Sequence, residues 1–522
     1  MFDIISLLMA GLIDVLSVKN VNMLKAEISR CEEFCNHNIL WPGFVPSRLL
    51  DIGAEGIEND SLRLISRGDV ISKATWIAPA EQVKYAALSY CWGPPLDAHK
   101  QCKTERKSLK ERLHAIPFVD LTPVVRDAVV IARRLSIPYL WVDSLCIIQD
   151  DTMDWENEAS LMGLVYSNAH ITICSLSAST CQNGFLERPS QTREFSNVEF
   201  DEMIKDWRCS SWSTRGWTFQ EEKLSTRLVY FGASKIHFCC GNWIYTEDQP
   251  TSSEVYERSI IDLGRLSLRN NRVQLLMDFW TWALVPQFSE REFTKAEDKL
   301  PAIAGVAKYI GDVTGYDYVA GIWKPRLFVE LIWCCDPLEG QLTALLAALR
   351  PNAPHYIAPS WSWAHFASVN RIDFFFGEKE TRFLKLEAKL EVWATRIGPN
   401  VYGRISDGEL IMTTKVLPVF PCYCRIYRSE NYNSTNCQKD SHSIVCVIDW
   451  SRGELDAGQQ IKLALVGSYT NSERTHKRYY GILVHHSPIL GKYYRVGIFD
   501  SPVFDREDLN FDKAEVKKII VI

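Results

Sequence analysis

Residues 139–178 read YLWVDSLCIIQDDTMDWENEASLMGLVYSNAHITICSLSA, and their order of apolar and polar residues decides the fold. The first four residues form an apolar run, which predicts a strand buried on both faces, as in the middle of a parallel sheet. Asp143 follows where this strand ends, with Cys146 and Gln149 just beyond it. Ligands of open α/β sheets bind outside the carboxyl ends of the strands, so these residues stand where a binding site is expected.

The same stretch continues into a helix and a second strand. Over residues 151–166 apolar side chains recur at spacings of four, three and four, which predicts an amphipathic helix. Residues 170–176 (HITICSL) are again an apolar run typical of a buried strand. Strand, helix and strand in this order predict a βαβ unit of a parallel sheet.

The alternation extends to both sides of this stretch. Residues 85–90 predict a strand that ends at a Gly-Pro-Pro turn. Thr122 and Pro123 mark the start of a helix, because Thr can cap a helix and Pro is tolerated at its first position. Residues 215–222 predict a helix that leads into a strand at 228–231. The predicted fold is therefore α/β, with a parallel sheet flanked by helices.

The length of 522 residues and the hydrophobic content of 47% predict a folded protein with two or three cores. Shifts in pattern divide the chain into a helical and loop extension (1–79), an α/β domain (80–245), a helical region (246–370) and a β-rich region (371–522). The apolar run at the N-terminus is shorter than the ~20 residues of a transmembrane helix. We expect an amphipathic helix there and no transmembrane segment.

The net charge and the cysteines indicate which partners and which cellular compartment are expected. The formal net charge of -6, without a run of Lys or Arg, gives no general attraction to nucleic acid. The 16 cysteines are scattered, which predicts reduced thiols in the cytoplasm. The closest approach to a metal-binding spacing is Cys31, Cys35 and His37, with Cys422 and Cys424 as a remote complement. Neither cysteine pair has the two-residue gap of a zinc knuckle, so no metal site is predicted.

Three blocks of sequence carry a family resemblance. They are YAALSYCWG at 85–93, the opening stretch from residue 140, and TRGWTFQEEKLSTRLVYF at 214–231. The residues of these blocks, their order and their spacing resemble those of the fungal heterokaryon incompatibility (HET) domain family. Three later segments, at 293–311, 318–335 and 358–366, resemble the region that often follows this domain.

The resemblance implies a flavodoxin-like sheet, similar to that of Toll/interleukin-1 receptor (TIR) domains. It also implies a cytoplasmic fungal protein of self/non-self recognition that triggers regulated cell death. The expected partners are another protein or the product of an incompatible allele, with self-association. Some TIR domains hydrolyse NAD with a helix-borne glutamate, so NAD is a candidate substrate, although the chain has no glycine-rich nucleotide motif. HET-domain genes also lie beside secondary-metabolite clusters, which leaves an accessory role there as a third alternative.

An enzyme that cleaves a glycosidic bond needs a carboxylate near the sugar, and Glu158 and Asp143 are the candidates. Glu158 lies on the predicted helix beside its apolar stripe, and Asp143 lies at the strand end. Alternatively, Glu158 is a surface carboxylate or the buried partner of an arginine such as Arg215. The remaining aspartates of the stretch are better explained as helix caps, namely Asp150, Asp151 and Asp154.

Seven residues are candidate ligand contacts, namely Ser89, Tyr90, Trp92, Cys146, Gln149, Arg215 and Trp217. The aromatic side chains could stack on a nucleotide base or pack in the core. Arg215 precedes a predicted helix and could bind an anion, or it could form a bridge to Glu221 or Asp143. Cys146 has no histidine near it in sequence, which favours a small buried cysteine over a nucleophile.

Overall fold

The computed structural model divides the chain into two compact units, Met1–Arg272 and Val273–Ile522, here called unit 1 and unit 2. The finer division into four segments stays a prediction. The structure describes residues 12–35, 37, 41, 43–53, 61–75, 83–189, 202–249, 253–254, 272–335, 338–350, 356–366, 371–377, 380–419, 424–427, 444–452, 460–470, 477–503 and 510–522. Within these ranges no helix combines the length and the apolar character needed to cross a membrane.

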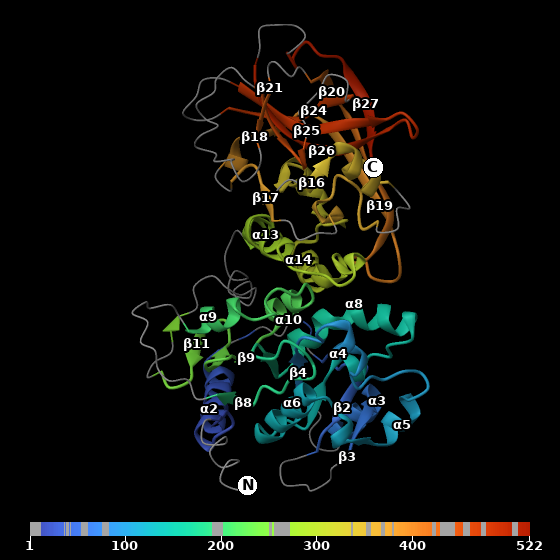
Figure 1. Cartoon of the computed structure of the whole chain (residues 1–522). Helices are drawn as coiled ribbons and strands as arrows, with labels where there is room; N and C mark the ends of the chain where they lie inside the picture. The colour runs from blue at the N-terminus through green and yellow to red at the C-terminus, as the bar shows by residue number, and fades with distance from the viewer. Residues whose placement is uncertain are drawn as a thin grey trace. The chain divides into compact units, whose positions relative to one another are not determined.

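Unit 1 is built on one ten-stranded mixed sheet (Figure 1). Its four central strands are parallel and lie side by side in the order β6 (Tyr139–Trp141), β4 (Tyr85–Ser89), β7 (Ile171–Ser175) and β9 (Leu228–Phe231). Numbered along the chain this order is 2-1-3-4, which is that of flavodoxin-like sheets. Every residue of β4 and β7 is buried, as their apolar runs predict. The predicted parallel sheet flanked by helices is confirmed.

Antiparallel strands extend this parallel core on both sides, so the sheet is mixed rather than wholly parallel. Beyond β6 lie β2 (Arg48–Asp51), β3 (Ser61–Ser66) and β5 (Ile116–Pro117). Beyond β9 lie β10 (Ile236–Cys239), β11 (Trp243–Thr246) and β12 (Ser253–Glu254). The segment expected to be an N-terminal extension of helix and loop thus supplies two strands of the central sheet.

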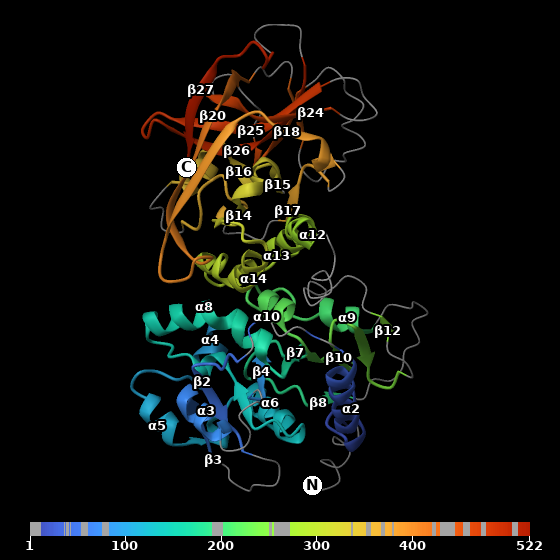
Figure 2. The same ribbon diagram turned by 180° about the vertical axis from the view of Figure 1, so that it is seen from behind.

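The predicted N-terminal helix falls mostly on residues 1–11, which lie outside the described residues. Its last part, Leu12–Asp14, is not helical but forms strand β1, which pairs with β8 (Glu187–Pro189). Helix α2 (Val18–Phe34) begins after Ser17, whose Oγ accepts a hydrogen bond from the Asn20 backbone N–H at 3.3 Å. In both views α2 runs beside the end of the sheet that carries β10 and β11 (Figures 1 and 2).

Two of the helices between the parallel strands start where the sequence predicts, whereas the helix expected from residue 215 begins at Thr218. Asp151 caps α8 (Thr152–Asn168), because its Oδ1 accepts hydrogen bonds from the backbone N–H groups of Met153 and Asp154 at 3.1 and 3.2 Å. Pro123 opens α6, but the Thr122 hydroxyl makes no cap and instead bonds Gln101 Oε1 at 3.1 Å. Besides α2, the described residues of unit 1 form the helices α3 (Arg67–Thr75), α4 (Pro95–His99), α5 (Leu109–His114), α6 (Pro123–Arg134), α7 (Asp143–Cys146), α8, α9 (Glu202–Arg208) and α10 (Thr218–Leu224).

Unit 2 begins with helices and ends in a nine-stranded sheet, as the change of period in the sequence predicts. Most strands of this sheet pair antiparallel; its parallel pairs are β21 with β22 and β26 with β27. The sheet contains β18 (Leu384–Leu386), β19 (Lys389–Arg396), β20 (Ile405–Pro418), β21 (Cys424–Tyr427), β22 (Ile444–Ile448), β24 (Ile461–Thr470), β25 (Lys477–Ser487), β26 (Lys492–Pro502) and β27 (Val516–Val521). The preceding elements are α12 (Arg272–Phe279), α13 (Val285–Ser289), α14 (Ala304–Thr314), β13 (Tyr318–Val319), β14 (Ile322–Trp323), α15 (Leu327–Glu330), β15 (Trp333–Cys335), β16 (Leu338–Gln341), α16 (Leu342–Ala348) and β17 (Ile372–Phe374).

A buried arginine connects the nine-stranded sheet of unit 2 to strand β15, which precedes that sheet in the chain. Arg495 of β26 donates a hydrogen bond to Asp449 Oδ2 at 2.7 Å and to the backbone oxygen of Trp333. Its guanidinium also lies over the Trp333 ring, 3.4 Å from the centroid. Because both charged groups are fully buried, this pair is part of the core of unit 2.

Candidate functional site

Several of the predicted site residues of unit 1 lie at the carboxyl ends of β4 and β6. Ser89 is the last residue of β4, and Asp143 begins α7 just after β6. In a sheet of order 2-1-3-4 the connections leave the first and third strands, here β4 and β7, in opposite directions. Ligands of such sheets bind at this switch point, outside the carboxyl ends of the strands. Because β4 is one of the two strands at the switch point, part of the predicted site lies where the topology favours a ligand.

Asp143 is the centre of one group of side chains at this edge. Its Oδ1 accepts hydrogen bonds from the Tyr90 hydroxyl at 2.8 Å and from the Ser144 backbone N–H at 2.7 Å. Its Oδ2 accepts one from Trp92 Nε1 at 2.8 Å. Burial raises the pKa of Asp143, and these hydrogen bonds oppose the rise because they stabilise the charged form. The structure thus brings together three predicted site residues, Tyr90, Trp92 and Asp143.

Two glutamines complete the surroundings of Asp143. Gln101 Nε2 donates to the Tyr90 hydroxyl, so Gln101 holds Tyr90 from the other side. Gln149, a predicted contact, donates instead to the backbone oxygens of Asp143 at 3.0 Å and Ile147 at 3.1 Å. Gln149 therefore secures the turn after β6. Gln101 could not be expected from the sequence, because the polar segment just after α4 has no motif of its own.

Glu221 of α10 is the second carboxylate at the switch point. Its Oε2 accepts a hydrogen bond from the Ser89 hydroxyl, whose oxygen in turn accepts one from Trp212 Nε1 at 2.7 Å. Burial raises the pKa of Glu221 to about 7, and the negative charge of Asp143 adds to the rise. Glu221 and Trp212 were not among the predicted ligand or catalytic residues, although Glu221 lies within the third block of the resemblance.

Arg215 acts on both of these carboxylates. Its positive charge opposes the rise in pKa of Asp143 and of Glu221. Its charge therefore acts on Asp143 and Glu221, the two residues to which a bridge is expected, and the bridge itself stays a prediction. Trp217 meets Trp155 of α8 edge to face, with ring centroids 6.1 Å apart. We call Ser89, Tyr90, Asp143, Trp212, Arg215 and Glu221 the switch-point cluster.

Glu158, the other predicted catalytic residue, belongs to a different group. Arg48 of β2 places its guanidinium 3.5 Å from Glu158 Oε1 and donates to both carboxylate oxygens of Asp154, at 2.7 and 2.6 Å. Ser47 also bonds the buried Glu158 carboxylate. Burial raises the pKa of Glu158, while Ser47 and Arg48 oppose the rise. Glu158 is thus the buried partner of an arginine, but of Arg48 and not of Arg215; we call Arg48, Asp154 and Glu158 the Arg48 cluster.

Cys146 has the environment of an inert core thiol. Its side chain is fully buried, and burial raises the pKa of the thiol to about 12. A thiol in this state holds little thiolate at neutral pH, so it is a poor nucleophile. This agrees with the alternative of a small buried cysteine.

The chemistry open to the switch-point cluster is proton exchange near neutral pH. Glu221 has a pKa of about 7 and accepts a hydrogen bond from the Ser89 hydroxyl. This contact lies at the carboxyl ends of the parallel strands, where ligands of such sheets usually bind. A metal ion has its candidate residues elsewhere: among the described residues, Cys31, Cys35, His37 and Cys240 form the one group with suitable spacing. Cys422, a predicted complement to the first three, lies outside the described residues.

Comparison with known proteins agrees with the family resemblance. Residues 85–221 match the family model of the heterokaryon incompatibility protein (HET), and this range contains all of the switch-point cluster. Over 250 residues the chain is 25% identical to the vegetative incompatibility protein HET-E-1 of Podospora anserina. The match covers 47% of this chain but only 16% of that relative's length. No solved structure matches the chain. The chain therefore contains a HET domain at residues 85–221 and is a distant homologue of HET-E-1.

Proposed function

We propose that this chain is a signalling protein of fungal self/non-self recognition, whose HET domain triggers regulated cell death after contact with a protein partner or a second copy. The observation that carries this proposal is the match of residues 85–221 to the HET family. The distant relative is itself named a vegetative incompatibility protein. The expected partner is the product of an incompatible allele or another cytoplasmic protein.

The hydrogen bonds of the switch-point cluster support a domain that acts by binding a protein partner and not by catalysis. The hydrogen bond from Ser89 to Glu221 joins the end of β4 to α10, and the one from Tyr90 to Asp143 joins the ends of β4 and β6. These carboxylates are engaged in holding elements together at the edge of the sheet. A rigid edge of this kind suits a domain that offers a fixed surface to a partner.

The proposal is tested by expressing the full chain from an inducible promoter in a filamentous fungus and counting dead cells with a membrane-impermeant dye. Wild type is expected to kill. Glu221→Gln keeps the shape and the hydrogen bond with Ser89 and should kill as well, whereas Glu221→Ala breaks the link between β4 and α10 and should kill less. Survival of cells that contain folded wild-type chain would overturn the proposal and favour the accessory role beside a metabolite cluster.

One observation favours a second candidate, an NAD glycohydrolase. Glu221 is a buried carboxylate with a pKa near neutrality, and it lies at the carboxyl ends of the strands, where ligands bind to flavodoxin-like sheets. In that reaction water replaces nicotinamide on the ribose, and a carboxylate stabilises the positive charge that develops on the sugar. Glu221 is the better placed carboxylate, because Glu158 is held by Arg48.

Nicotinamide release from NAD by the purified full chain separates the two functions. Signalling by contact predicts no release from wild type. Release that is lost in Glu221→Gln and kept in Glu158→Gln would replace the contact proposal with the enzyme. Release that both variants keep would show catalysis that depends on neither carboxylate and would also reject a role through contact alone.

A further inference from the structure

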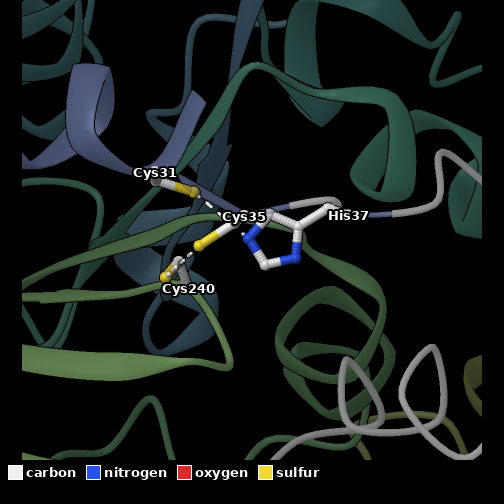
Figure 3. A group of neighbouring side chains, drawn as sticks. All are labelled: Cys31, Cys35, His37 and Cys240. Atoms are coloured by element: carbon white, nitrogen blue, oxygen red, sulfur yellow. Dashed lines mark hydrogen bonds between the residues drawn. The ribbon is translucent and has the colours of Figure 1, made fainter. Parts of the chain in front are cut away.

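Three cysteines and a histidine from two distant segments meet beside the sheet of unit 1 (Figure 3). Cys31 lies in the last turn of α2, Cys35 is the residue that ends this helix, and His37 follows two positions later. Cys240 comes directly after β10, 205 positions beyond Cys35. A spacing of four residues places Cys31 and Cys35 on the same face of the helix, so both can reach one point.

The four ligand atoms lie as close together as the donors around a single metal ion. Cys31 Sγ is 3.2 Å from His37 Nε2, Cys35 Sγ is 3.9 Å from Cys240 Sγ, and all four atoms lie within 4.8 Å of one another. Tetrahedral zinc, with Zn–S bonds of about 2.3 Å, places two sulfur ligands about 3.8 Å apart. A disulfide needs about 2.05 Å between sulfurs, and all three cysteines are free.

Hydrogen-bond donors surround the three sulfur atoms. Arg227 Nε donates to Cys31 Sγ at 3.1 Å, and Asn242 Nδ2 donates to Cys35 Sγ at 2.7 Å. The backbone N–H groups of Asn242 and Trp243 are directed at Cys240. N–H donors of this kind stabilise thiolates and orient metal ligands. The Arg227 charge also offsets the negative charge of a zinc ion bound by three thiolates.

We propose that Cys31, Cys35, His37 and Cys240 bind one zinc ion, which fastens the end of α2 to the turn between β10 and β11. Three thiolates and one imidazole form a closed tetrahedral set, which is the pattern of structural zinc sites. Soft sulfur ligands disfavour magnesium and calcium. Cys31 and Cys240 are fully buried, so two of the ligands are shielded from water.

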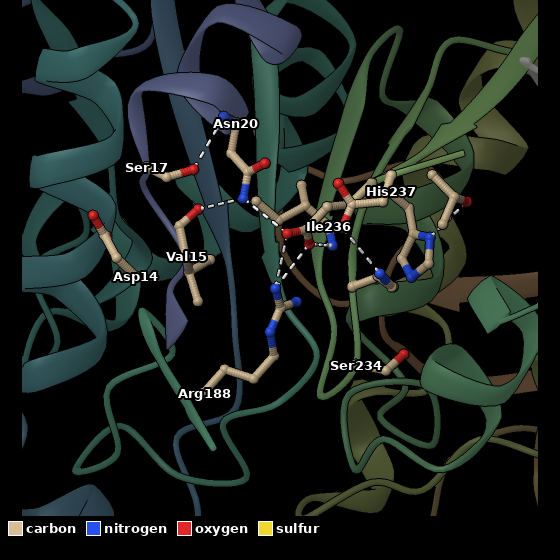
Figure 4. Close-up of polar contacts among 12 residues, drawn as sticks. Asp14, Val15, Ser17, Asn20, Arg188, Ser234, Ile236 and His237 are labelled. Atoms are coloured by element: carbon tan, nitrogen blue, oxygen red, sulfur yellow. Dashed lines mark hydrogen bonds and ion pairs between the residues drawn. The ribbon is translucent and has the colours of Figure 1, made fainter. Parts of the chain in front are cut away.

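The zinc site complements a second attachment at the other end of α2 (Figure 4). There Asn20 Nδ2 donates to Glu247 Oε1 at 2.8 Å, and Arg188 contacts both Glu247 oxygens at 2.9 Å. The start of the helix is thus held by the hydrogen bond from Asn20 to Glu247, whose carboxylate is fixed by Arg188, and its end by the metal. Loss of zinc should therefore loosen residues 31–35 far more than the segment around Asn20.

Metal analysis of the full chain, purified under reducing conditions and without a histidine tag, tests the site. We expect about one zinc ion per chain in the wild type and a loss of most of it in Cys31→Ser and Cys240→Ser. Cys209→Ser is the matched control, because Cys209 is an exposed free cysteine outside the group, and it should retain the metal.

A second measurement on the wild type avoids variants that fail to fold. Chelation should raise hydrogen exchange at residues 31–35 and at the β10–β11 turn, with little change at Asn20, and cobalt should restore protection with the visible absorption of a tetrahedral thiolate complex. Folded wild type with little metal, with iron or copper in place of zinc, or with a disulfide among these cysteines would overturn the proposal. None of these results depends on cell killing or on NAD.

Discussion

The switch-point cluster and the Arg48 cluster both place carboxylates near the ends of the same parallel strands. The two clusters differ in the partners that compensate the negative charge of these carboxylates. Glu158 and Asp154 face a guanidinium directly, with N···O distances of 3.5 and 2.6 Å. Glu221 and Asp143 accept hydrogen bonds from neutral donors, chiefly Ser89, Tyr90 and Trp92. Both kinds of partner favour the charged form of a carboxylate, but a direct cation does so more strongly than neutral donors, so burial can raise the pKa further where the donors are neutral. The first arrangement is suited to a fixed link and the second to a group that titrates.

The largest effect is expected from removing the cation. Arg48→Met leaves Asp154 and Glu158 without their charge partner and also removes the hydrogen bond from Arg48 Nε to the Cys146 backbone oxygen at 2.6 Å. Breaking a mostly buried ion pair in this way costs about 3–5 kcal/mol. Urea unfolding of the full chain measures the loss, and hydrogen exchange should locate it in β2 and α8.

Arg106→Met provides the control for that change. Arg106 pairs with Asp151 on the surface, so its removal should alter stability far less. Equal losses in the two variants would mean that burial does not strengthen the Arg48 cluster.

A second prediction concerns the pH dependence of stability. Glu221 has a folded pKa of about 7, above its ordinary value of 4.5, so the folded state holds the proton more tightly than the unfolded state. The resulting stabilisation is complete below pH 4.5 and is lost as the pH rises through 7, a decrease of about 3 kcal/mol. Glu221→Gln should remove this decrease in urea unfolding between pH 4.5 and 8.

Glu158→Gln supplies the comparison for the pH experiment. Its pKa is also raised by burial, but Ser47 and Arg48 oppose the rise, so this variant should change the slope less. A steeper change in Glu158→Gln than in Glu221→Gln would reverse the assignment of the titrating group.

A third prediction compares two buried tyrosine hydroxyls. Tyr90 donates to the Asp143 carboxylate at 2.8 Å, and Tyr85 donates to the neutral backbone oxygen of Val165 at 2.6 Å. Hydrogen bonds to charged groups are the stronger, so Tyr90→Phe should cost about 2 kcal/mol and Tyr85→Phe about 1 kcal/mol. If the two losses in urea unfolding are equal, Asp143 is uncharged under the conditions of the measurement.

The smallest effect is expected from Ser47→Ala. This change removes a neutral hydrogen bond to Glu158 and leaves Arg48 in place, so it should cost only about 0.5–1 kcal/mol. A double-mutant cycle with Arg48→Met measures whether the two contacts are coupled. A loss as large as that of Arg48→Met would show that the serine, and not the cation, holds Glu158.

The parallel core could be predicted from the sequence because strands buried on both faces are continuous apolar runs. β4, β6 and β7 lie within one residue or two of their expected positions. The strands β2 and β3 could not be assigned in this way, since their place beside β6 is set by contacts between residues far apart in the chain, such as Leu50 with Leu140. Local pattern contains no information on such pairings.

The site residues also fall into two groups, those that local sequence pattern can identify and those that only the folded chain brings together. Asp143 was identified because it directly follows a strand, and its place at the carboxyl edge needs only local pattern. Glu221 was missed as a site residue because a run of Gln, Glu, Glu and Lys has the composition of an exposed helix, although all seven residues of α10 are buried. Cys240 was missed because only the folded sheet brings it to Cys31 and Cys35.

The pairing of β2 with β6 has a consequence for how the HET domain can be separated from the rest of the chain. The family match ends at residue 221, before β9, and begins at residue 85, after β2. A fragment cut at those limits would lose a neighbour from each side of the parallel core, exposing the backbone groups of β6 and β7 as unpaired sheet edges. Unpaired apolar edges of this kind can pair with other chains, so the isolated fragment should aggregate. The smallest soluble piece must reach from β2 to β9 at least.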